Sequence, residues 1–300
     1  MYIIENANLL KDKQLNTRSF LISENRITKI GSHFNHYRLI KMNAAPYIMT
    51  PSFVLFIANI PHLGSFQELK TCLIQECILK GCTTLFTYVS VSYENELSAK
   101  INQLKTALLS NPIDFIIGVK VPIRMITSSF IRKCKKEKIS AIFVDLQNPD
   151  ELEKVPWGWI REAMFPFNSP LIPLISSEQK KEVKNVLSKW KGIMKRENIP
   201  ALYDEIKENQ PLTVTILNKI GLYPQKASLM CGMELSYNLY TKTKEIQNVD
   251  EVNLFHYHGD RLVVTVQKGT VLRAGDNVIF KPGNGEYVRV RTPSYFSLTI

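Results

Sequence analysis

The chain has 300 residues, of which 45% are hydrophobic and 22% charged, and its formal net charge at pH 7 is +11. This length and hydrophobic content suffice for a sizeable core, which excludes an intrinsically disordered chain. The longest apolar runs, such as Phe53–Ile60, are far shorter than the roughly 20 residues of a membrane-spanning helix. The first ten residues lack a basic start and a long apolar run, so we expect no export signal and a soluble cytoplasmic protein.

The start of the chain predicts a small β unit, and the middle predicts alternating strands and helices. Four short segments rich in Ile, Leu and Tyr are the first predicted strands: Tyr2–Asn6, Ser19–Ser23, Arg26–Ile30 and Tyr37–Met42. From Thr50 onwards, apolar strands alternate with helical segments, which is typical of a parallel sheet with crossover helices. Five strands are predicted there, over Phe53–Asn59, Thr83–Val89, Asp114–Val119, Ser140–Asp145 and Leu171–Ser176.

The densest basic stretch, Lys180–Arg196, is predicted to form an amphipathic helix after the fifth strand. Apolar residues recur at helical spacing, whereas Lys184, Lys191 and Lys195 lie elsewhere on the helix. We interpret this basic side as a solvated surface, with polyanion binding as the alternative. One more helix, Ala201–Lys207, is expected, and then β-like stretches over Leu235–Tyr240, Val252–Tyr257, Leu262–Gln267 and Asn277–Phe280.

Five strands between residues 51 and 215 are too few for a full eight-stranded barrel, which usually needs about 250 residues. A shortened barrel and an open doubly wound sheet fit the strand pattern equally well.

Several stretches follow one another along the chain as recognisable landmarks: Ile27–Gly31, Ile48–Asn59, Leu79–Leu85, Leu212–Tyr240 and Val266–Gly275. In this order they resemble the metal-dependent amidohydrolases of the dihydroorotase and dihydropyrimidinase type. The resemblance implies an α/β protein with a truncated or distorted TIM-barrel-like domain over residues 51–224. It also implies a small composite β-sandwich formed by both termini, residues 1–50 and 225–300.

The metal ligands of that family are missing from the matching positions. The family has a His-x-His pair on its first barrel strand, where this chain has Ile57 and Asn59. The bridging lysine of the fourth strand is replaced by Ile142 or Phe143, and no histidine occurs between His62 and His256. Aliphatic side chains cannot coordinate a cation, so we expect no metal and no other cofactor.

Four residues near predicted strand ends are candidates for a residual binding pocket, because active sites of barrels gather at the carboxyl ends of the strands. These are Asn59, His62, Lys120 and Asp145. The alternative is that His62 lies in an exposed loop and that Asp145 caps a strand or turn.

Two further groups of residues allow more than one interpretation. His256 and His258 would point to one face of a strand, but without a third ligand nearby we expect surface residues. The aromatic residues Trp157, Trp159, Phe165 and Phe167 could form a partner surface, and we favour a plug that covers core of the shortened barrel.

These observations lead to three hypotheses of function. The leading one is a catalytically degenerate relative of dihydroorotase and dihydropyrimidinase with a binding, regulatory or assembly role. The second is a hydrolase that acts on carbon–nitrogen bonds of cyclic amides through a rearranged site. The third is a polyanion-binding protein that uses the basic helix 180–196. We expect a homo-oligomer or a complex with an active amidohydrolase relative, and neither nucleic acid nor a membrane as partner.

Overall fold

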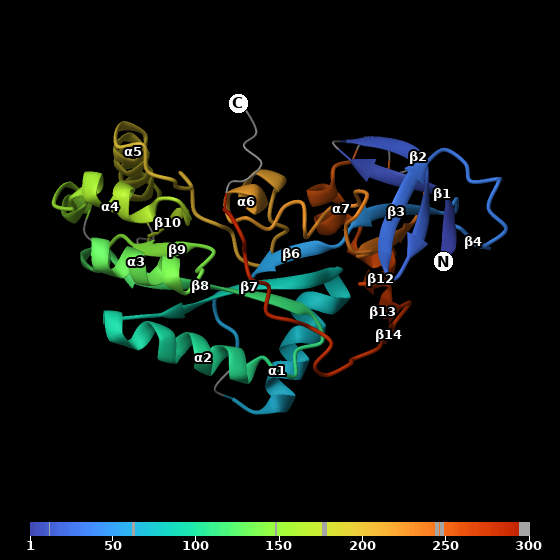
Figure 1. Ribbon diagram of the computed structural model, residues 1–300, viewed down its shortest axis with the longest axis horizontal. Helices are drawn as coiled ribbons and strands as arrows, with labels where there is room; N and C mark the ends of the chain where they lie inside the picture. The colour runs from blue at the N-terminus through green and yellow to red at the C-terminus, as the bar shows by residue number, and fades with distance from the viewer. Residues whose placement is uncertain are drawn as a thin grey trace.

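The computed structural model describes residues 1–11, 13–61, 64–147, 149–175, 179–243, 246 and 249–293. These residues form two sheets, a nine-stranded mixed sheet and a five-stranded parallel sheet that curls (Figure 1). Within the described residues, no helix is both long and apolar enough to cross a membrane.

Both ends of the chain build the mixed sheet. The first part contributes β1 (Tyr2–Lys11), β2 (Gln14–Ser23), β3 (Arg26–Gly31), β4 (Ile40–Asn43) and β5 (Tyr47–Pro51). The last part contributes β11 (Tyr237–Thr241), β12 (Leu262–Gln267), β13 (Thr270–Ala274) and β14 (Asn277–Val278). The two parts join where β5 pairs antiparallel with β11. The predicted contribution of both termini to one β unit is therefore correct, whereas the sandwich arrangement and the domain boundaries stay predictions.

The parallel sheet contains all five strands that the sequence predicted between residues 51 and 215. They are β6 (Phe53–Phe56), β7 (Cys82–Ser90), β8 (Asp114–Pro122), β9 (Ile142–Asp145) and β10 (Leu171–Leu174). Their order in space is their order in the chain, because each crossover adds the next strand on the same side. A sheet that grows this way curls in one direction, which gives half of a barrel (Figure 1).

Helices cover the outer face of the half-barrel. α1 (Phe66–Cys72), α2 (Leu97–Ala107) and α3 (Ser128–Lys136) lie along this face (Figure 1). α4 (Trp157–Met164) and α5 (Lys180–Arg196) follow β9 and β10 and share the same core. Alternate strand residues such as Leu55, Leu85 and Ile117 point into this core. The intervening residues point to the inner face, where α6 (Val214–Lys219) packs.

One segment, residues 200–212, pairs with both edges of the parallel sheet. At the β10 edge, Leu171 donates its backbone N–H to the Pro200 oxygen and accepts from Leu202, at 2.9 and 2.8 Å. At the β6 edge, Asn209 and Leu212 donate to the oxygens of Phe56 and Val54, at 2.9 and 3.0 Å. The backbone groups that missing barrel strands would have paired are therefore partly satisfied by this segment.

Two sequence predictions of secondary structure are wrong. The expected helix Ala201–Lys207 is not formed, because Pro200–Leu202 extends beside β10 instead. The expected strand Val252–Tyr257 is helix α7 (Glu251–Tyr257), whose first turn is capped by Asp250, which accepts from Asn253 N at 2.8 Å. His256 therefore lies in the last turn of a helix and His258 just after it, so they are no strand pair.

The aromatic residues between β9 and β10 divide into buried and exposed members. Trp157 packs edge-on against Trp190 of α5 on the outer side, and Phe167 packs in the inner core. Trp159 and Phe165 are 65% and 70% exposed. Trp157 and Phe167 are thus buried, while the role of these aromatic residues as a plug of the shortened barrel stays a prediction.

Candidate functional site

The inner face of the half-barrel carries a stack of aromatic rings. Phe56 and Phe143 stack with centroids 5.0 Å apart and planes inclined by 16°. Phe86 lies 5.5 Å from Phe143, and Tyr88 lies 5.0 Å from it. Phe56 pairs with Phe86 across β6 and β7, so both rings project to the same face. The stack therefore follows from register and alternation along three strands.

Gly118 of β8 allows the ring of Phe143 to cross from β9 towards β7. A Cβ at this position would lie 2.9 Å from the Phe143 ring and 3.1 Å from the Ala141 oxygen. Gly118 stands beside Tyr88 in the sheet, so the missing side chain opens the path between the two rings. A close approach of this kind requires glycine in the strand.

The residues of this face do not fit the metal that the amidohydrolase resemblance implies. Ile57 packs in the outer core with the helices, and the inward residue at the end of β6 is Phe56. Across the described part of the chain, no three His, Cys, Asp or Glu side chains converge in a way that could hold a metal ion. Aromatic and aliphatic groups cannot act as ligands, so no reaction step through a metal follows from these residues.

Two of the predicted site residues meet at the carboxyl ends of β8 and β9. Lys120 Nζ lies 3.4 Å from Asp145 Oδ2. Asp145 is only 9% exposed, and its Oδ1 atom is buried without a hydrogen-bond partner among the described residues. The pair lines a cavity of about 420 Å³, together with Ser90, Ser92, Arg124, Gln147 and Glu151. Opposite charges at this mouth can bind a molecule that carries both an anionic group and an N–H donor.

Tyr88 adds a half-buried phenol to the same mouth. Burial raises its pKa, Lys120 acts against this rise, and the carboxylates of Glu208 and Asp145 add to it. Because the pKa is raised, the phenol stays protonated near neutral pH and can donate a hydrogen bond.

Asn59 lines a neighbouring cavity of about 480 Å³ with Tyr88, Ser90 and Lys100. Ser90 lines both cavities, so they lie side by side at the strand ends. His62 lies outside the described residues. The structure thus brings Lys120 and Asp145 into contact and places Asn59 nearby, while their role as a site stays a prediction.

Sequence reasoning missed Tyr88, Ser90 and Glu208. Tyr88 and Ser90 could have been found, because they follow the inward Phe86 at the period of two that a strand imposes. Glu208 could not, because it reaches the mouth through the segment 200–212, which was predicted to begin as a helix.

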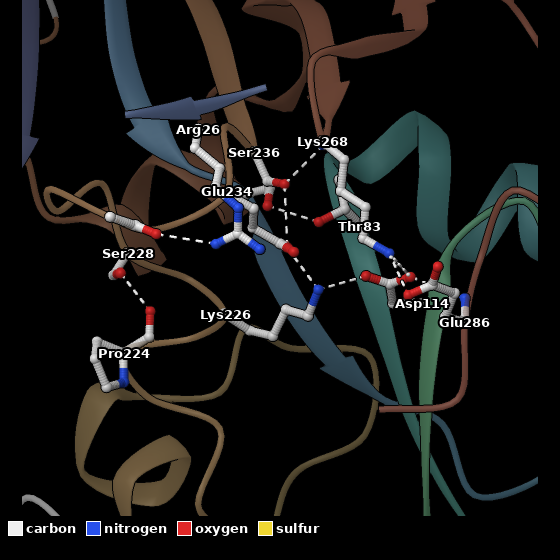
Figure 2. Close-up of polar contacts among 12 residues, drawn as sticks. Arg26, Thr83, Asp114, Pro224, Lys226, Ser228, Glu234, Ser236, Lys268 and Glu286 are labelled. Carbon is white, nitrogen blue, oxygen red and sulfur yellow. Dashed lines mark hydrogen bonds and ion pairs between the residues drawn. The ribbon is translucent and has the colours of Figure 1, made fainter. Parts of the chain in front are cut away.

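A second polar assembly lies at the opposite, amino-terminal end of β8 (Figure 2). Asp114 accepts from Lys226 Nζ at 2.5 Å and from Lys268 Nζ at 2.9 Å. Lys226 also contacts Glu234 at 2.5 Å, and Lys268 contacts Glu286 at 3.1 Å. We call these five residues the basal ion-pair network.

The basal ion-pair network joins the two sheets. Asp114 begins β8 of the parallel sheet, whereas Lys268 lies in the turn between β12 and β13 of the mixed sheet. Burial disfavours the charged form of Asp114, but Lys226 and Lys268 outweigh this effect and lower its pKa. In barrels, the amino-terminal ends of the strands usually serve stability, so we interpret the network as a structural clamp.

A third cavity of about 470 Å³ lies where β5 passes into β6, beside α6 and the start of α7. Its wall is mainly apolar, with Phe53, Val54, Leu212 and Leu217. Asp250 stands on its rim, but this carboxylate already caps α7. The barrel mouth is therefore the better candidate for a binding site, because polar groups converge there.

Comparison with solved structures shows the fold. The chain is similar to dihydropyrimidinase from Brevibacillus agri NCHU1002, with a TM-score of 0.63, 11% identity, and coverage of 97% of this chain and 99% of that one. It is similar to D-hydantoinase from Bacillus sp. AR9, with a TM-score of 0.62, 10% identity, and coverage of 98% and 99%. It is also similar to atrazine chlorohydrolase TrzN from Arthrobacter aurescens TC1 complexed with zinc, with a TM-score of 0.53, 9% identity, and coverage of 93% of this chain and 96% of that one.

No protein-family model and no curated protein sequence matches the chain. The likeness to hydantoinases and dihydropyrimidinase therefore rests on the fold alone, which agrees with the distorted barrel-like fold that the sequence landmarks implied.

Proposed function

We propose that this chain is a catalytically degenerate relative of the hydantoinase-type amidohydrolases that binds a small polar molecule at the barrel mouth without hydrolysing it. The aromatic stack of Phe56, Phe86, Tyr88 and Phe143 carries the proposal. An open metal centre needs ligands and space for a water molecule on the inner face. Rings packed against one another supply neither.

The mouth suggests the chemistry of the ligand. Lys120 offers an ammonium to an anionic group, and Tyr88 offers a neutral phenol. The unpaired buried oxygen of Asp145 costs about 1–3 kcal/mol if nothing donates to it. A ligand with a carboxylate for Lys120 and an amide N–H for Asp145 fits both groups, and dihydroorotate is a probe with this chemistry.

Three measurements on the purified full chain test the proposal. We expect less than about a tenth of an equivalent of transition metal per chain, because the inner face offers no ligands. A true metal site in the folded protein would keep its ion during purification. We expect no ring opening of dihydroorotate, hydantoin or dihydrouracil. In isothermal titration calorimetry, dihydroorotate should bind more tightly than dihydrouracil, which lacks the carboxylate.

A pair of variants places the binding at the mouth. Lys120→Gln should weaken dihydroorotate binding, whereas Lys41→Gln, whose lysine pairs with Glu5 in the mixed sheet, should not. Ring-opening activity that co-purifies with a full equivalent of metal would overturn the proposal that the chain is catalytically degenerate. Equal effects of both variants, or no binding, would remove the ligand assignment.

A further inference from the structure

The exposed side of α5 concentrates positive charge. The helix has seven basic residues and one acidic residue, and its buried face is formed by Val186, Trp190, Ile193 and Met194. Lys180, Lys184, Lys191 and Lys195 are exposed, and helical spacing places them along one stripe. The predicted amphipathic helix is correct.

Three lysines gather around one aromatic ring between α5 and α6. The Nζ atoms of Lys191 and Lys195 lie 5.7 and 5.6 Å from the centroid of Tyr203, and Lys219 Nζ lies at 4.9 Å. Two of the lysines come from α5 and one from α6, while Tyr203 follows the segment that pairs with β10. The tertiary fold, and not the helix alone, therefore assembles the cluster.

Two of the three lysines have no carboxylate partner in the part of the chain that the structure describes. Lys191 and Lys195 form no ion pair within the ranges that the structure describes, although Asp204 and Glu205 follow Tyr203 in sequence. Lys219 donates to the Ala201 oxygen at 2.7 Å, and burial lowers its pKa. Like charges placed together repel, so an anion that neutralises them is stabilised at this position.

We propose that Lys191, Lys195 and Lys219, arranged around Tyr203, form a binding site for a compact anion that carries several phosphate groups. Each ammonium brings three donors, and lysine binds phosphate as a point charge. All three ammonium groups lie within 5.7 Å of one ring centre, which suits closely spaced phosphates better than an extended strand. The ring is covered by lysines, so it offers no open platform on which nucleic-acid bases could stack.

Titration calorimetry with inorganic tripolyphosphate on the full chain tests this site. The double variant Lys191→Gln/Lys195→Gln should bind about tenfold more weakly, because it removes two of the three ammonium groups that would pair with the phosphates. Lys180→Gln/Lys181→Gln is the matched control, because it removes the same charge from the far end of the same helix. The affinity of this control for tripolyphosphate should stay within about twofold of that of the unchanged chain, because a change in net charge far from the site is largely screened.

Two further comparisons sharpen the test. Lys219→Gln should also weaken the binding of tripolyphosphate, although this lysine lies on a different helix. Vesicles with a polyphosphorylated lipid headgroup, compared with free tripolyphosphate, distinguish a lipid source of the phosphates from a soluble one.

Three results would overturn the proposal. The first is absence of saturable binding to either probe. The second is an equal loss in both double variants, which would mean diffuse attraction to a basic helix. The third is tighter binding of single-stranded DNA than of both probes, with an equal loss of DNA binding in the two double variants. An extended strand would then be the ligand.

Discussion

Removal of one charge from the basal ion-pair network has a predictable cost. In Asp114→Asn the side chain keeps its shape, but Lys226 and Lys268 lose the counter-ion that they share. Asp114 is fully buried and the Lys226 side chain is 4% exposed. Breaking such a buried pair costs about 3–5 kcal/mol. Since each lysine retains one glutamate, Glu234 or Glu286, we expect the lower end, about 3 kcal/mol.

The pH dependence gives this prediction a second, independent readout. The two lysines outweigh the effect of burial, so the pKa of Asp114 in the folded chain lies below 3.8. A lowered pKa stabilises the fold above the unfolded value, and the contribution is lost as the pH falls through the folded pKa. The cost of Asp114→Asn should therefore stay constant near neutral pH and shrink below pH 3.8.

Urea unfolding at a series of pH values measures both quantities, with the midpoint and slope fitted separately. Glu286→Gln is the matched control, because this carboxylate belongs to the same network but is 77% exposed. Its change should stay within about 1 kcal/mol. A cost of Asp114→Asn below about 1 kcal/mol at neutral pH, or one that does not shrink in acid, would refute the assignment of the network as a clamp.

The remaining predictions concern packing and charge at single positions. Phe143→Ala should cost about 4 kcal/mol in urea unfolding because it empties the aromatic stack, whereas Phe165→Ala, at a 70% exposed ring, should stay within about 0.5 kcal/mol. Lys268→Gln should destabilise near neutral pH, and the difference should disappear as alkaline pH passes the pKa of Lys268, which Asp114 raises above 10.5 against the effect of burial. Gly285→Ala should lower the melting temperature, because its Cβ would meet the Ile113 oxygen at 1.9 Å; no drop would mean that residues 285–288, which pair with Phe115 of β8 through backbone hydrogen bonds, do not lie against this strand.

The sequence predicted the parallel strands well because each is a short apolar run bounded by a helix or a turn. β8 begins at Asp114 as expected. Prediction failed where tertiary contacts decide the local structure. Pro200–Leu202 extends beside β10 because this sheet edge offers unpaired backbone groups, and the local sequence carries no sign of that distant edge.

The candidate site was predictable only in part, for a similar reason. Lys120 and Asp145 end neighbouring parallel strands, so their proximity follows from strand order. The basal ion-pair network was not predictable, because Asp114, Lys226 and Lys268 are separated by more than a hundred residues or belong to different sheets. A lysine with a buried partner has the same sequence signature as a lysine on the surface.

The closure of the half-barrel bears on the expected partners. Missing barrel strands predict open edges, and an open edge favours a second subunit that covers it. Here Leu171 donates its backbone N–H to Pro200 and accepts from Leu202 at the β10 edge, and Leu212 donates to Val54 at the β6 edge. The same chain thus covers both edges, while Leu202 and Leu212 add apolar area to the inner core beside α6. Since both edges are partly paired within the chain, the missing strands alone do not call for a second subunit, and the exposed side chains of Trp159 and Phe165 are another surface through which an oligomer could form.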